Sequence, residues 1–238
     1  MPIYSLGPDL VFPHPSLSED GLLAVGGDLS TERLVLAYKN GIFPWYNEEE
    51  PILWWSPDPR FVLFPEELKV SKSMRPYFNQ GKFRITIDQV FDQVIDNCSN
   101  VPRIGQEGFS SWITPEMKAA YIKLHKEGIA HSVEVWDDEE LVGGLYGIAL
   151  GKVFYGESMF SKKSNASKFG FISLVRRLQQ LGYKLIDCQQ ETPHLASLGA
   201  RAIDLKQFLS FLDTNKSEST HIGHWGDIMD NEIPCTFI

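Results

Sequence analysis

The order of elements between residues 130 and 189 constrains the fold of this chain more than any other feature. Three runs with strand character come first, then a helix, then a fourth strand: HSVEVW (131–136), LVGGLYGIAL (141–150), VFYGES (153–158), a helix over 165–180 that Gly182 ends, and KLIDCQ (184–189). The acidic turn at 137–140 joins the first two runs as a solvated antiparallel hairpin. This order is typical of an α+β domain with a mixed β-sheet.

The chain before this segment divides into an irregular region and a region of regular secondary structure. Residues 1 to about 60 are rich in Pro, Gly and aromatic residues, and they contain one short helical pattern, 31–40. Regular elements follow, for which the patterns predict a strand over FRITI (83–87), a helix over 89–97 and a helix over 114–128 with Thr114 as its N-cap. We therefore expect a small irregular N-terminal subdomain, residues 1–62, and a main domain, residues 63–238.

The composition narrows the class of protein. A net charge of −9 over 238 residues argues against nonspecific coating of nucleic acid, because neutralising phosphates needs an excess of cations. Cys98, Cys188 and Cys235 are far apart, and no histidine spacing suits a metal, which favours a reducing compartment and no metal site. No secretion leader or stretch near the ~20 apolar residues of a membrane span is present. We expect a cytoplasmic protein.

One segment departs from the acidic average. Between Glu157 and Asp187 there are six cations and no acid: Lys162, Lys163, Lys168, Arg176, Arg177 and Lys184. Such a run is either a solvated helix face or an anion-binding patch, and the pattern alone favours neither.

Two strand ends carry candidate chemistry. GESMFS presents Glu157 and Ser158 at the end of a strand predicted to be central, where a carboxylate must be paired or belong to a site. In IDCQ, alternation places Asp187 and Gln189 on one face and the residues beside them on the other. By itself this spacing is more typical of a solvated face, but Glu157 and the basic run nearby favour a shared cleft.

Aromatic residues gather in turn-rich sequence. For Trp54 and Trp55 we expect packing within the N-terminal subdomain. For Trp45 and Trp112, a stacking surface for an unpaired base is a rival interpretation to packing, because exposed bases are held on aromatic faces.

Ten blocks in sequence resemble one family over nearly the whole chain. They are GLLAVGGDLS (21–30), GIFPWY (41–46), PILWWSPDPR (51–60), WIT (112–114), AHSVEVW (130–136), LVGGLYG (141–147), GESMFS (156–161), NASK (165–168), LIDCQ (185–189) and SLGA (197–200). They resemble the bacterial leucyl/phenylalanyl-tRNA-protein transferases. The resemblance implies a C-terminal domain with the acetyltransferase-like (GNAT) fold, related to the transferases that build peptidoglycan cross-bridges from aminoacyl-tRNA.

The resemblance also implies a reaction. The free α-amine of an acceptor protein that begins with Arg or Lys attacks the aminoacyl ester at the 3′ end of the tRNA. The transferred residue is Leu or Phe, with Met as a further candidate, and it marks the acceptor for degradation by the N-end rule. No cofactor is implied, and we expect a monomer whose partners are the aminoacyl-tRNA and the acceptor protein.

The site residues are carried over by position. Asp187 and Gln189 are implied to carry the chemistry. We expect Asp187 to be the electrostatic partner that accepts the proton of the amine, directly or through the amide of Gln189, and Gln189 to orient the amine. Trp45 and Trp112 are implied to stack on the terminal adenosine, while Glu157 and Ser158 hold the aminoacyl end. A side-chain pocket is implied for Leu145, Phe154, Met159, Phe171, Leu174, Leu178 and Ile186. For some of these residues, packing in the core is the alternative interpretation. Contacts with the tRNA backbone are expected from Lys162, Lys163, Lys168, Arg176 and Arg177.

Several alternatives stay open. A covalent acyl-enzyme through Ser158 or Cys188 is one route, and a cell-wall precursor or another small amine is an alternative acceptor. A noncatalytic module that shields a charged 3′ end is an alternative of a different class. The sequence has no P-loop, dinucleotide-binding, nucleophile-elbow or H-E-x-x-H motif, and it lacks an R/Q-x-x-G-x-G/A loop for acetyl-CoA.

Overall fold

A seven-stranded mixed sheet is the centre of the computed structural model, which describes residues 3–100 and 111–228. Its strands lie in the order β11 (Arg201–Ile203), β5 (Arg60–Leu63), β10 (Leu185–Gln189), β9 (Val153–Ser161), β8 (Glu140–Leu150), β7 (Ala130–Asp137) and β6 (Arg84–Ile87). β9 and β10 are parallel, whereas the other neighbouring pairs are antiparallel. The predicted α+β class with a mixed sheet is confirmed. Cys235 lies outside the described residues.

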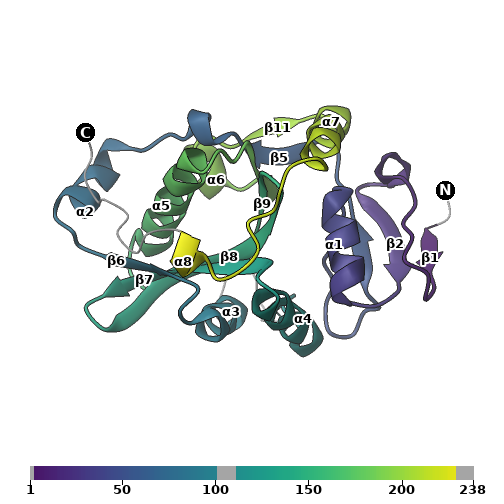
Figure 1. Cartoon of the computed structure of the whole chain (residues 1–238), viewed down its shortest axis with the longest axis horizontal. Helices are drawn as coiled ribbons and strands as arrows, with labels where there is room; N and C mark the ends of the chain where they lie inside the picture. The colour runs from purple at the N-terminus through teal and green to yellow at the C-terminus, as the bar shows by residue number, and fades with distance from the viewer. Residues whose placement is uncertain (1–2, 101–110, 229–238) are drawn as a thin grey trace.

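Helices cover both faces of this sheet (Figure 1). One face carries α5 (Ala166–Gln180) and α2 (Arg75–Asn79), and the other carries α3 (Phe91–Asn100) and α4 (Pro115–Lys126). Gly143 in β8 lets α5 pack closely, since a Cβ at this position would lie 2.7 Å from the Ala166 Cβ. None of the helices in the described ranges is long and apolar enough to cross a membrane.

The helix starts follow the capping rules in one case and depart from the predicted start in another. α4 begins after Thr114, whose hydroxyl accepts the N–H of Met117 (3.2 Å). α3 begins at Phe91, two residues after the predicted start at Gln89. Residues 88–90 form a bend, in which Asp88 has a φ of 58°, and the first helical hydrogen bond is accepted by the Val90 carbonyl from the N–H of Val94 (3.1 Å).

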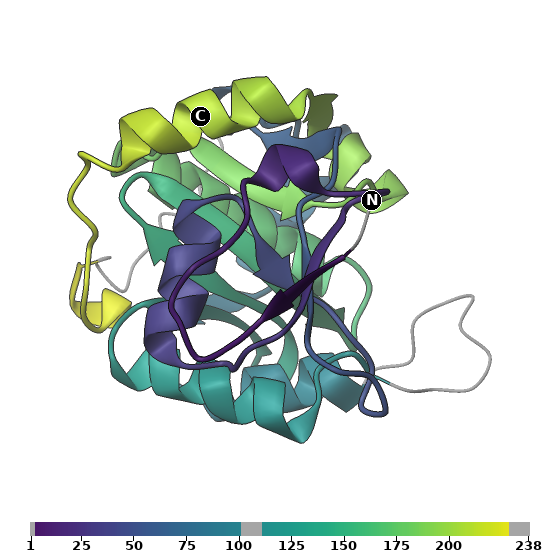
Figure 2. The ribbon, with the colours of Figure 1, turned by 90° about the vertical axis from the view of Figure 1, so that its right-hand side faces the viewer.

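A smaller sheet and one helix form the N-terminal unit, which covers one end of the large sheet (Figure 2). Its elements are β1 (Tyr4–Leu6), β2 (Leu22–Gly26), α1 (Thr31–Lys39), β3 (Phe43–Pro44) and β4 (Leu53–Trp55). Trp54 is fully buried in this unit and donates to the Gly26 carbonyl (2.8 Å), as its predicted packing role requires. Since β5 belongs to the large sheet, the predicted division after residue 62 falls within a strand, and it stays a prediction.

Short helices complete the C-terminal part: α6 (Pro193–Ser197), α7 (Leu205–Asn215) and α8 (Trp225–Ile228). α8 packs against β6, an edge strand of the large sheet. The backbone N–H of Trp225 donates to the buried Asp88 carboxylate (2.8 Å), and its ring stacks on His131 at 3.8 Å between centroids. His131 in turn contacts the same carboxylate at 2.8 Å.

Replacing Trp225 with Ala is expected to lower the free energy of unfolding by about 3–5 kcal/mol, because removing a buried indole leaves a cavity. Urea denaturation followed by circular dichroism measures the change. Ile222→Ala is the control, since that side chain is 64% exposed and its loss should change stability by no more than about 0.5 kcal/mol. Equal losses in the two variants would show that Trp225 is not docked.

Candidate functional site

A pocket opens where the two parallel strands of the large sheet separate. β9 and β10 pair from Val153 to Tyr155, and β9 then continues to Ser161 while β10 ends at Gln189. Beyond the last pair, the strand ends leave a cavity of about 480 Å³. This is a size that suits a small-molecule site, and the ends of parallel strands are common places for one.

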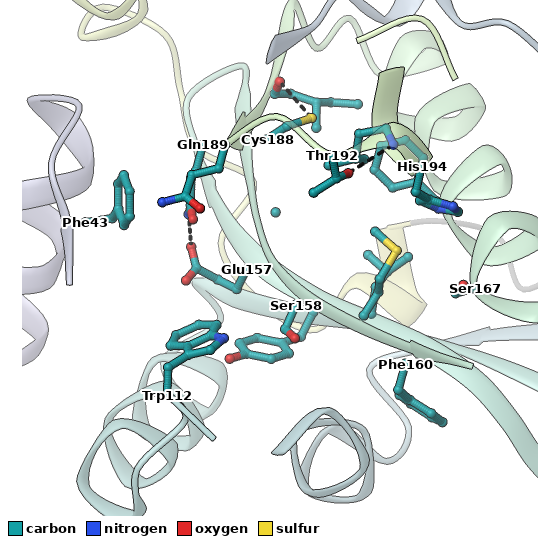
Figure 3. Close-up of a pocket in the computed structure, with 18 of the residues that line it drawn as sticks. Phe43, Trp112, Glu157, Ser158, Phe160, Ser167, Cys188, Gln189, Thr192 and His194 are labelled. Atoms are coloured by element: carbon teal, nitrogen blue, oxygen red, sulfur yellow. Dashed lines mark hydrogen bonds between the residues drawn. The ribbon is translucent and has the colours of Figure 1, made fainter. Parts of the chain in front are cut away.

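Polar side chains lie on both sides of the pocket, and on one side they are accompanied by aromatic rings (Figure 3). Phe43, Trp112, Glu157 and Gln189 lie on one side, and Thr192, His194 and Ser167 lie on the other. Apolar side chains from β8, β9, α5, β10 and α6 line the cavity as well: Leu145, Met159, Phe171, Ile186 and Leu195. The cavity therefore has carboxyl, amide and aromatic groups on one side and hydroxyl and imidazole groups on the other, and apolar side chains form much of its lining.

Gln189 reaches this pocket because β10 is irregular at its end. The register with β5 shifts between Asp187 and Gln189, and Gln189 has a φ of 62°. Ile186, Cys188 and Gln189 all line the pocket, and Asp187 does not. The prediction that Asp187 and Gln189 share one face is therefore wrong, because alternation of side chains ends where a strand bulges.

Asp187 is instead one half of a buried ion pair. Its carboxylate accepts two hydrogen bonds from Arg60, at 2.9 Å from Nε and 2.6 Å from Nη2, and both side chains are fully buried. Arg60 also donates to the Gly41 carbonyl (3.2 Å), and its guanidinium lies 4.7 Å from the ring centroids of both Phe43 and Phe208. The arginine thus joins β5, the N-terminal unit and α7 to β10.

Asp187 also fixes the irregular strand end. Its Oδ1 accepts the backbone N–H of Gln189 (2.9 Å). Because Asp187 is fully buried, paired with Arg60 and does not line the pocket, it cannot accept a proton directly from a substrate amine, and that predicted route is wrong.

Glu157 is the carboxylate that faces the pocket. Its Oε1 accepts from Gln189 Nε2 (2.8 Å), and its Oε2 accepts from the Tyr121 hydroxyl (2.9 Å). The Tyr121 hydroxyl is also hydrogen-bonded to Tyr38 of α1. Burial raises the pKa of Glu157 to about 7, against the hydrogen bonds from the tyrosines and Gln189 that lower it. Glu157 can therefore take up or release a proton near neutral pH.

Cys188 faces the same pocket but is a poor nucleophile. Burial raises the pKa of its thiol well above the usual range, and the neighbouring Asp187 acts in the same direction. Because the thiolate is the reactive form, a covalent route through Cys188 is disfavoured.

The predicted side-chain pocket divides into two groups. Leu145, Met159, Phe171 and Ile186 line the cavity, whereas three others are core residues that do not: Phe154, Leu174 and Leu178. Leu174 and Leu178 lie farther along α5, beneath the sheet. The Phe154 ring points toward Gly147, where a Cβ would come within 2.5 Å of it.

The predicted adenosine-binding residues line the same cavity. Trp45 is 37% exposed, and its ring meets that of Trp55 edge-on at 5.6 Å. Trp112, partly buried, lies beside Glu157, and Ser158 is buried in the pocket wall. The structure brings these four predicted residues together, and their roles stay predictions.

The predicted basic run follows the β9–α5–β10 crossover, so its two ends lie at opposite ends of the strands. Lys163 contacts Asp137 (2.9 Å) and Glu140 (3.0 Å), which offset its charge. Lys184 lines a second cavity with Lys152. The run is therefore not one patch, because α5 returns the chain from the end of β9 to the start of β10 between the first and the last cation.

The structure draws attention to a second basic run, which was not predicted from the sequence. Residues 68–87 contain no acid and five exposed cations: Lys69, Lys72, Arg75, Lys82 and Arg84. This segment packs on α5, since the rings of Phe78 and Phe169 stack at 4.3 Å and Asn165 donates to the Tyr77 hydroxyl (3.1 Å). A count of consecutive cations without acids would have found it.

Phe43 and Arg60 were missed although both lie in blocks that resemble the family, GIFPWY and PILWWSPDPR. Tyr38 and Tyr121 had only the signal of apolar helix positions, because no sequence pattern shows a hydroxyl pair between two helices. These contacts depend on distant segments meeting.

A pocket with one carboxyl and amide pair, an aromatic side and an apolar wall is the site of an enzyme that binds a small group with an apolar side chain. Profiles described as "Leucyl/phenylalanyl-tRNA protein transferase" and as its "N-terminal domain" match residues 62–213 and 27–58. The chain belongs to the leucyl/phenylalanyl-tRNA-protein transferase family, a family of aminoacyltransferases.

Curated relatives carry the same description. The protein from Christiangramia forsetii is 63% identical over 213 residues, covering 88% of this chain and 100% of that one. The protein from Syntrophobacter fumaroxidans is 55% identical over 226 residues, covering 94% and 96%.

Solved structures are more distant. A GCN5-related N-acetyltransferase from Kribbella flavida is 9% identical with a TM-score of 0.38, covering 71% of this chain and 59% of that one. L-PGS from Bacillus licheniformis is 13% identical with a TM-score of 0.38, covering 73% and 54%. At these values the acetyltransferase-like assignment stays a prediction.

Arg60→Met is expected to lower the free energy of unfolding by about 3–5 kcal/mol, because it leaves the buried Asp187 carboxylate without its cationic partner. The double variant Arg60→Met/Asp187→Asn should lose less than the sum of the two single variants. Urea denaturation of all four proteins measures this. A double variant that loses the full sum would show that the two residues are not coupled.

Proposed function

We propose that this protein transfers Leu or Phe, with Met as a further candidate, from aminoacyl-tRNA to the N-terminal α-amine of proteins that begin with Arg or Lys. The observation that carries the proposal is one pocket with an aromatic and carboxyl side and an apolar wall, which suits an aminoacyl-adenosine end. The reaction takes place in the cytoplasm, and the transferred residue marks the acceptor protein for degradation. The active protein is a monomer.

In the proposed complex the terminal adenosine lies against Trp45 and Trp112, because unpaired bases stack on aromatic faces. The amino-acid side chain lies on the apolar wall that includes Met159 and Phe171. Ser158 hydrogen-bonds near the ester. An apolar wall discriminates side chains by only ~1–3 kcal/mol per methylene, so the preference among large apolar residues is graded.

The chemistry uses Glu157 and Gln189. The acceptor amine attacks the ester carbonyl carbon, a C–N bond forms and the bond to the ribose oxygen breaks. Glu157 takes the proton that the amine loses and returns it to the departing ribose oxygen. Gln189 donates to Glu157 through Nε2, which leaves its amide oxygen to accept an N–H of the amine. Asp187 acts through the position of Gln189.

The first test follows radiolabelled leucine from charged tRNA to two peptides that begin with Arg or with Asp. Label is expected on the Arg peptide alone, and Glu157→Gln should lower its rate about 10²–10⁴-fold, as for loss of a general base. Glu191→Gln makes the same change at an exposed position and is the control. No label on either peptide would contradict the transferase function and favour a tRNA-binding module.

The pH dependence supplies a second test of Glu157. The carboxylate must be ionised to accept a proton, so kcat should rise as pH increases through about 7. The acceptor amine adds its own limb near ~7.7–8.0, because it must be neutral to attack. Glu157→Gln should remove the rise in kcat near pH 7 that Glu157 causes and keep the rise that the acceptor amine causes. An unchanged profile in this variant would exclude Glu157 as the base.

We also propose that phosphates of the tRNA lie along α2 and α5. Lys168 and Arg176 are on α5, and the guanidinium of Arg176 lies 5.2 Å from the Phe78 ring centroid on α2. The exposed cations of residues 68–87 extend this surface. Because α5 also contributes Ser167 and Phe171 to the pocket, this surface is continuous with the ester-binding site.

The triple variant Lys72→Ala/Arg75→Ala/Lys82→Ala should bind charged tRNA more weakly. The slope of log affinity against log salt should fall by about 1 for each phosphate contact removed. Filter binding over a range of salt concentrations measures both. Lys184→Ala, on the second cavity, is the control and should match wild type. An unchanged slope in the triple variant would place the tRNA elsewhere.

A further inference from the structure

A chain of hydrogen bonds runs from the pocket into the N-terminal unit. Tyr38 of α1 and Tyr121 of α4 are both fully buried, and their hydroxyls are hydrogen-bonded to each other. The Tyr121 hydroxyl donates its single proton to Glu157 Oε2 (2.9 Å). Tyr38 must therefore donate to Tyr121, which fixes the direction of the chain toward the carboxylate.

Other groups around Glu157 act on the same carboxylate as this chain of hydrogen bonds. Gln189 Nε2 occupies its other oxygen (2.8 Å), and Tyr146 of β8 packs edge-on against Tyr121 with 5.5 Å between ring centroids. Asp187 of β10 also acts electrostatically on Glu157, and Arg60 pairs with it. With a donor on each oxygen, the carboxylate has a fixed orientation, and the hydrogen bonds from the tyrosines and Gln189 favour its ionised form.

We propose that Tyr38 and Tyr121 are positioning residues that hold the Glu157 carboxylate against Gln189, so that the N-terminal unit helps to build the reaction centre. This inference rests on the proposed function, because it gives Glu157 the proton transfer. Neither tyrosine is among the residues that line the pocket. Their loss affects the chemical step and leaves binding of the aminoacyl end unchanged.

The first experiment compares Tyr121→Phe and Tyr38→Phe with wild type over a range of pH. In Tyr121→Phe the acidic limb of kcat should move up by about one pH unit, so that kcat at pH 6 falls about tenfold while KM for aminoacyl-tRNA stays constant. Tyr38→Phe should also move this limb upward, since the Tyr38 hydroxyl is hydrogen-bonded to Tyr121 and lowers the pKa of Glu157.

Tyr155→Phe is the matched control. Tyr155 is also fully buried, its ring lies 5.2 Å from that of Tyr38, and its hydroxyl has no hydrogen-bond partner in the described part of the chain. It should keep the wild-type pH profile. If Tyr121→Phe and Tyr155→Phe lose activity equally with unmoved profiles, the tyrosines only fill space and the proposal is overturned.

A second readout needs no activity and separates this proposal from the reaction. Carbon-13 NMR of the protein with labelled glutamate carboxyls follows the titration of Glu157, which Glu157→Gln identifies by the loss of one signal. Its midpoint should rise by about one pH unit in Tyr121→Phe and stay in place in Tyr155→Phe. A midpoint that does not move in Tyr121→Phe overturns the proposal even where transfer is active, and a moved midpoint supports it even where transfer fails.

Discussion

The buried pair between Arg60 and Asp187 is the contact on which the rest of the site depends. Two charges removed from water are tolerated only when their hydrogen bonds are satisfied, and here the carboxylate meets two guanidinium nitrogens and the backbone N–H of Gln189. The guanidinium meets the Gly41 carbonyl and two aromatic rings. One ion pair thus sets both the attachment of the N-terminal unit and the irregular end of β10.

The pocket follows from that attachment and from the separation of β9 and β10. A parallel pair that ran to its full length would fill this space with backbone, whereas the bulge after Asp187 opens it. The N-terminal unit then closes one side with Phe43 and Trp45. Glu157 lies at the junction, where burial and its tyrosine and amide donors bring its protonation change close to neutral pH.

Local patterns predicted the elements well and the site unevenly. The α+β order, the Thr114 cap and the turn at 137–140 follow from short-range rules, and the structure has all of them. Strand alternation placed Asp187 in the cleft, and it failed because a bulge cannot be read from period 2 alone. The apolar wall was predicted in part, because core and pocket residues have the same composition.

The sequence by itself determined the class of fold, the family and the set of polar residues near the strand ends, since each rests on adjacent residues or on blocks in order. Only the tertiary structure decided which carboxylate faces the substrate. That choice depends on Arg60 reaching Asp187 across 127 positions of the chain, and on Tyr38 and Tyr121 meeting from separate helices. Contacts between segments so far apart leave no local pattern, because their geometry exists only once the sheet and the N-terminal unit have packed together.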